Sequence, residues 1–416
     1  MTQWSLSETF DPKPSGSTGV THRVGSNVEE SLGRLLDQWV PPNQAFLARS
    51  AAQLIDGRVP VIATGDGHAL LEPLVLAWLT SPTTQFDLAS LLLGALPPDH
   101  QFPDVSVIAD DGGVVELPGL GQFDGNSTGE ELSLRWLGRE RVLVRRNGRQ
   151  DGTEVVLQPV PMVPDTHAVL AQTAHPLLKR FYRTEVDGAP VIVETSTETL
   201  RHSSSIVEAF SLLARTVPRL HAHLADTIRR ITVHRAGRVH SFATPAAHGA
   251  VFLAALDDDT EIGFVEDLVH QGGHVLCTAM TVNRDVFFTV PAETPLAEIT
   301  GIDDETRSLY DAFHGVFTEG AMILTLHRLL DLAGLTPRQV HETRGRLGLI
   351  ASRTVTDLAN VWRPGLFTDE GLRILECSRA ALIETVDRRR DELSALDLTG
   401  QPYAFSYAAF AARNPP

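Results

Sequence analysis

The chain has 416 residues, 43% of them hydrophobic, which suffices for one large or two medium globular domains with a substantial core. Its 52 acidic and 35 basic residues give a formal net charge of −17, which argues against a nucleic-acid-binding protein because such proteins need a cationic face. With two cysteines, no visible signal peptide and no apolar run near the ~20 residues that span a bilayer, we expect a cytoplasmic protein without disulfides or a membrane partner.

The N-terminal part of the chain divides into three stretches of different character. Residues 1–26 are rich in Ser, Thr, Gly and Pro and lack periodicity, which predicts a flexible arm. From residue 27 to about 94 the apolar spacing is helical, as in NVEESLGRLLDQWV. Residues 104–163 alternate apolar and polar side chains between DDGG, NG and DG turns, which predicts a small antiparallel β segment. We therefore treat 27–163 as an N-terminal helical plus β-rich region.

Helical patterns dominate residues 164–416. HAVLAQTAHPLL (167–178) predicts a helix, and Ser203–Ser205 predict the N-cap of a helix that begins at IVEAF. Strands are expected within 229–256, followed by a helix that contains FVEDLVHQGGHVLCTAM (264–280). Further helices are expected over 308–334, from Thr336 to Val361 and from Thr368 onward. The predicted fold class is α+β and mainly helical.

Two histidines stand four residues apart in an otherwise apolar helical run. On one helix face, His270 and His274 can direct both imidazoles at a single cation. The alternative is that they are ordinary core or surface histidines. Gly272-Gly273 weakens the helix, a cost that is tolerable if another element or a substrate approaches closely. Gln271 stands where a zinc peptidase carries its glutamate base, and an amide accepts no proton at neutral pH.

A third histidine, His314, lies on the next long helix among apolar residues in YDAFHGVF. The segments VEDLVHQGGH, DDETRSLYDAFHGVF and TPAAHGAVFLAAL together resemble the HExxH-motif peptide-modification proteins of ribosomal peptide gene clusters. The resemblance covers roughly residues 165–400. It departs from the family at Gln271, and the family's downstream Pro-Trp-Arg pattern is reduced here to Arg307.

The resemblance implies a metal site between two C-terminal helices, in which His270, His274 and His314 hold Fe(II) and leave positions for 2-oxoglutarate and O₂. Arg307 is the first candidate to bind the distal carboxylate of 2-oxoglutarate, and Arg284 is the second. Each of these arginines can instead be a surface residue.

Further residues near the proposed ligands are candidates for supporting roles. Tyr310 is a candidate to hydrogen-bond the cosubstrate or a metal ligand, and Glu266 is a candidate acceptor for the second nitrogen of His270. Tyr310 can instead serve packing, and Glu266 can be a surface charge. Glu319 is a less favoured ligand than His314, and Cys277 is expected to be a buried apolar residue.

The function implied is an iron(II)/2-oxoglutarate-dependent oxygenase that hydroxylates an unactivated carbon, such as a side-chain β position. Its substrate would be a peptide or another natural-product intermediate. A degenerate zinc-dependent hydrolase and a non-catalytic peptide-binding partner protein remain open as alternatives.

Overall fold

The computed structural model describes residues 27–55, 67–81, 86–96, 103–146, 151–183, 188–189, 191–332 and 334–415. The arm predicted over 1–26 lies outside them. The chain forms two compact units, each described by itself below. Unit 1 comprises Met1–Trp39, Ser211–Ala222 and Met280–Pro416, and unit 2 comprises Val40–Phe210 and His223–Ala279. The division at residue 164 that the sequence suggests stays a prediction.

The fold is α+β and mainly helical, as predicted. The helices are α2 (Val28–Ile55), α3 (Pro73–Thr80), α4 (Leu88–Leu92), α5 (Ser196–Thr216), α6 (Pro218–Thr227), α7 (Glu261–Met280), α8 (Leu296–Thr300), α9 (Leu309–Leu329), α10 (Pro337–Val361), α11 (Asp369–Ser394) and α12 (Tyr407–Arg413). The strands are β1 (Val105–Ile108), β2 (Val115–Leu117), β3 (Gly121–Phe123), β4 (Glu131–Gly138), β5 (Arg141–Arg146), β6 (Thr153–Val156), β7 (Val169–Ala171), β8 (Arg230–Arg235), β9 (Phe242–Ala243) and β10 (Ala250–Ala255).

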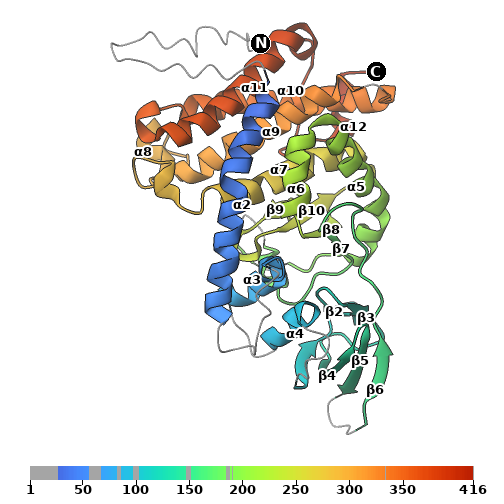
Figure 1. Cartoon of the computed structure of the whole chain (residues 1–416). Coiled ribbons are helices and arrows are strands. Elements are labelled where there is room, and N and C mark those ends of the chain that lie inside the picture. Colours follow the sequence, from blue (N-terminus) through green and yellow to red (C-terminus); the bar gives the residue numbers. More distant parts are fainter. Residues whose placement is uncertain are drawn as a thin grey trace. The chain divides into compact units, whose positions relative to one another are not determined.

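The antiparallel β segment of unit 2 lies where the sequence predicts it. Strands β1, β4, β5 and β6 pair in that order, each antiparallel to its neighbour, and β2 pairs with β3 (Figure 1). Alternate residues of β4 and β5, such as Leu134 and Val142, are fully buried, while their neighbours face outward. This period of two is the pattern expected for a sheet with one covered face.

A second sheet of unit 2 has the order β7-β8-β10-β9. β7, β8 and β10 are parallel, and their register aligns Val169, Arg230 and Ala250. The strands predicted within 229–256 are thereby confirmed. The helix predicted over 167–178 is wrong, because Val169–Ala171 pairs with β8 instead and Pro176 has no N–H to continue a helical ladder.

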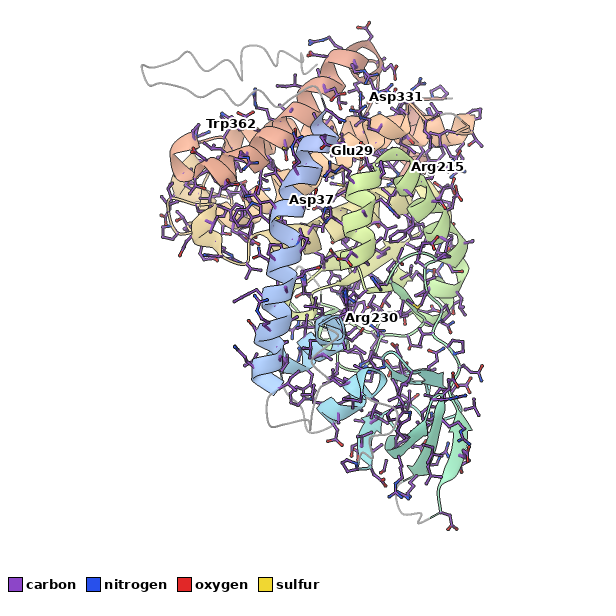
Figure 2. All side chains as sticks on the ribbon, in the orientation of Figure 1. Glu29, Asp37, Arg215, Arg230, Asp331 and Trp362 are labelled. Carbon is purple, nitrogen blue, oxygen red and sulfur yellow. The ribbon has the colours of Figure 1, made fainter. Side chains whose placement is uncertain are left out.

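Strand β8, which lies inside the sheet, carries Arg230 (Figure 2), and this buried side chain forms ion pairs with two glutamates outside the sheet. The Arg230 guanidinium binds both Glu116 oxygens, at 2.5 and 2.9 Å, and Glu72 at 3.2 Å. Burial tends to raise the pKa of Glu116, but the charge and hydrogen bonds of Arg230 outweigh it and lower that pKa. For Glu72 burial prevails, and its pKa is raised. Removing one partner of such a group generally costs about 3–5 kcal/mol.

Three long helices of unit 1 begin where the sequence predicts them. Ser308, Thr336 and Thr368 each accept a hydrogen bond from the backbone three residues on, at the starts of α9, α10 and α11. These long helices pack on one another (Figure 1). α9 approaches α11 at Gly320, where an added Cβ would lie 2.7 Å from the Ser378 Cα.

The start of α5 differs from the sequence prediction. The helix begins at Ser196, so Ser203–Ser205 lie in its interior rather than at its N-cap. The side chain of Ser203 bonds the Leu200 carbonyl, a local contact that serine also makes inside helices.

Candidate metal centre

The histidine pair lies on α7 in unit 2, on the half-exposed face of an otherwise buried helix. His270 and His274 are half-buried, whereas Val269 and Leu276 are fully buried. The two imidazole rings have their centroids 4.9 Å apart and are tilted by 42°. The helical spacing therefore brings the rings side by side, as the sequence predicts, in a position where both can turn toward one ion.

Gln271, the residue that replaces the motif glutamate, contacts the first histidine. Its Nε2 lies 3.2 Å from Nδ1 of His270, and the side chain is buried. Among the described residues, Oε1 of this amide has no hydrogen-bond partner. A half-turn of the amide puts Oε1 at the same place, where it accepts from Nδ1–H. His270 then presents an unprotonated Nε2, the tautomer that binds a metal.

The glycine after Gln271 allows close packing of α7 on α6. A Cβ added to Gly272 would lie 2.5 Å from Cδ2 of Leu224 and 2.9 Å from Cδ1 of Ile228. The close approach that the sequence suggested is therefore made by these apolar side chains. Any larger residue would have to displace two fully buried groups, so the absence of a side chain at this position fixes the separation of α7 from its neighbour.

His314 lies on α9 in unit 1, beside the ring of Tyr310. Its ring centroid is 5.4 Å from that of Tyr310, one turn earlier. The Tyr310 hydroxyl and the Thr281 hydroxyl are 2.8 Å apart, and the Arg284 guanidinium lies 3.7 Å above the Tyr310 ring. Stacking of a cation on this ring is favourable. The structure therefore brings together three residues that the sequence singled out separately: Arg284, Tyr310 and His314.

Arg307, the first candidate for binding the cosubstrate, already binds two carboxylates of unit 1. Its guanidinium contacts Glu305 at 2.7 and 3.0 Å and Asp357 at 2.8 and 3.2 Å. The hydrogen bonds that Arg307 donates to Glu305 and then to Asp357 raise the pKa of Arg307. By contrast, Arg284 pairs with Glu293, which is exposed, and such surface pairs contribute at most about 1 kcal/mol. A carboxylate ligand would displace Glu293 from Arg284 far more readily than it would displace both acids from Arg307.

The remaining candidates have distinct settings. Glu266 is half-exposed and lies one turn before His270 on α7, and its role as an acceptor stays a prediction. Glu319 is largely buried beside Asp357, and burial followed by the Asp357 charge raises its pKa well above the ordinary value. A carboxyl group that favours its protonated form is a poor metal ligand. Cys277 is fully buried, as expected of a core thiol.

The structure thus groups the predicted residues into two sets. His270, His274 and Glu266 belong to unit 2, and Arg284, Tyr310 and His314 belong to unit 1. That His314 joins the histidine pair on one metal stays a prediction. Sequence reasoning missed the Thr281–Tyr310 hydrogen bond, which no motif signals, and a group of His68, His167 and Asp226 in unit 2.

Comparison with known proteins adds no relative. No protein-family model matches the chain, and no curated protein sequence gives a significant match. Among the described helices, none combines the length and the apolar character that crossing a bilayer requires.

Proposed function

We propose that the protein is an iron(II)/2-oxoglutarate-dependent oxygenase that hydroxylates an unactivated carbon of a peptide or related biosynthetic intermediate. The observation that carries the proposal is the arrangement on α7: two neighbouring imidazoles, with a neutral amide on Nδ1 of His270. Imidazole donors suit iron, and this amide can hold His270 in the ligating tautomer.

The same amide argues against metal-dependent hydrolysis at this site. A hydrolase needs a group that removes a proton from water, and Gln271 removes none at neutral pH. Oxygen activation needs no such base. Iron(II) with 2-oxoglutarate and O₂ supplies the oxidation, in which one oxygen atom enters the substrate C–H bond and the other enters succinate, with release of CO₂.

The chain's own residues have separate tasks in this proposal. His270 and His274 hold the metal, and His314 completes the set by analogy with the resembled family. Arg284 binds the distal carboxylate of 2-oxoglutarate, a role for which its readily exchanged surface pair suits it better than Arg307. Tyr310 orients Arg284 through its ring.

Succinate formation tests the proposal. Purified protein supplied with Fe(II), 2-oxoglutarate and O₂ should form succinate, and His274→Ala or His314→Ala should abolish this. His240→Ala, which changes a half-buried histidine outside both sets, should leave the rate unchanged. An iron-loaded wild-type protein that forms no succinate would reject the oxygenase assignment.

A further inference from the structure

Two histidines and an aspartate lie close together at the amino-terminal edge of the parallel strands in unit 2. The register that aligns Val169 with Arg230 places His167, two residues before β7, beside the end of α6. The His167 N–H donates to the carbonyl of Ala225 at 3.3 Å. This bond puts the imidazole next to the carboxylate of the following residue, Asp226, with Nε2 4.0 Å from Oδ1.

His68 reaches the same place from a different segment. Its ring centroid is 5.4 Å from that of His167. The residues that follow it are anchored: Leu71 is buried, and Glu72 binds the buried Arg230. The position of His68 is therefore set by the core of unit 2, although its own side chain is exposed.

We propose that His68, His167 and Asp226 form a binding site for a divalent transition-metal ion, separate from the histidine pair of α7. One ligand atom from each residue lies within 4.8 Å of the others. Two imidazoles and a carboxylate are a donor set for zinc, iron or cobalt, whereas calcium and magnesium prefer oxygen donors throughout. Metal–ligand bonds of ~2.1 Å imply ligand atoms ~3.4 Å apart in a tetrahedral site. Loading therefore draws the side chains together by roughly an ångström, which exposed side chains accommodate.

Arg229 donates a hydrogen bond to the ring of His68. Its Nη2 lies 2.7 Å from Nδ1 of His68. A guanidinium only donates, so Nδ1 accepts and the neutral ring carries its proton on Nε2. Metal binding at Nε2 moves the ring proton to Nδ1, and binding at Nδ1 puts the metal where Arg229 donates, so the Arg229 hydrogen bond is lost in either case. The site therefore binds metal more weakly than a preformed one, and its open positions lie beside a cation that favours an anionic further ligand.

Zinc binding in a His270→Ala/His274→Ala background tests this site without the α7 pair. The chelator-treated protein is titrated with Zn²⁺ against a chromophoric competitor, and Co²⁺ is used to record the visible spectrum of the bound ion. We expect binding of Zn²⁺ and a rise in the thermal unfolding temperature. His68→Asn, His167→Asn and Asp226→Asn should each weaken Zn²⁺ binding by about tenfold or more.

His240→Asn in the same background is the matched control and should bind Zn²⁺ as the background does. The proposal is overturned if the background protein binds no Zn²⁺, or if His167→Asn and Asp226→Asn bind it as tightly as the background. Because the α7 histidines are absent throughout, this result is independent of whether the oxygenase proposal holds.

Discussion

Replacing Gln271 tests whether its amide sets the tautomer of His270. Gln271→Ala removes one hydrogen bond, at 3.2 Å, from a buried side chain. Such a bond contributes a net ~0.5–1.5 kcal/mol, and 1.4 kcal/mol corresponds to about tenfold in affinity. Loss of the outer partner of a ligating histidine costs about 10–100-fold. We therefore expect Gln271→Ala to bind Fe(II) about tenfold more weakly, with Gln271→Glu close to wild type because a carboxylate also accepts from Nδ1–H.

The assay is anaerobic Fe(II) titration of the wild type and the two variants, with thermal unfolding as a check that each is folded. Thr278→Ala, one turn beyond His274 on the same half-exposed stripe, is a matched control and should bind Fe(II) as the wild type does. If Gln271→Ala binds Fe(II) as tightly as the wild type, the amide does not orient His270. If Gln271→Glu binds as weakly as Gln271→Ala, the acceptor argument is wrong.

Other predictions concern the cosubstrate, pH and packing. Arg284→Gln should raise the KM for 2-oxoglutarate about tenfold or more, whereas Arg307→Gln should leave it nearly unchanged; the reverse result would restore Arg307 as the carboxylate-binding residue. Burial lowers the pKa of several histidines, to about 3 for His175 and about 4 for His234, His248 and His327. Below pH 6.5, the ordinary pKa, each of these histidines takes up a proton when the protein unfolds. The free energy of unfolding, measured by urea titration, should therefore fall from pH 6.5 toward pH 4. Equal free energies of unfolding at pH 7 and pH 5 would contradict this. Gly320→Ala should cost about 1–3 kcal/mol by overpacking, whereas Gly315→Ala on the same helix, with no described atom within 4 Å of the added Cβ, should cost nothing; equal effects would refute the packing argument.

The elements that the sequence predicts correctly carry local signals. Thr336 and Thr368 mark the starts of α10 and α11 because their hydroxyls cap the backbone, whatever packs around them. The alternation in β4 and β5 likewise reports a one-sided sheet. The segment 167–178 carries no such signal: its apolar residues suit a helix as well as a strand, and only pairing with β8 decides between them.

In the candidate site, too, the sequence predicts what neighbouring residues determine and misses contacts between residues far apart in the chain. The side-by-side placement of His270 and His274 follows from helical spacing alone and is found as predicted. The preference for Arg284 over Arg307 depends on Glu305 and Asp357, and Asp357 lies 50 residues from Arg307, so no local pattern could reveal that contact. His68, His167 and Asp226 come from three separate segments and meet only through the strand register and the end of α6.

Iron content after anaerobic reconstitution tests the central claim most directly. The account predicts about one tightly bound Fe(II) per chain, lost in His274→Ala and in His314→Ala but kept in Asp226→Asn. Tightly bound iron that persists without His274 or without His314 in an Asp226→Asn background, or that disappears in Asp226→Asn alone, would contradict the assignment of the metal to the α7 pair and His314.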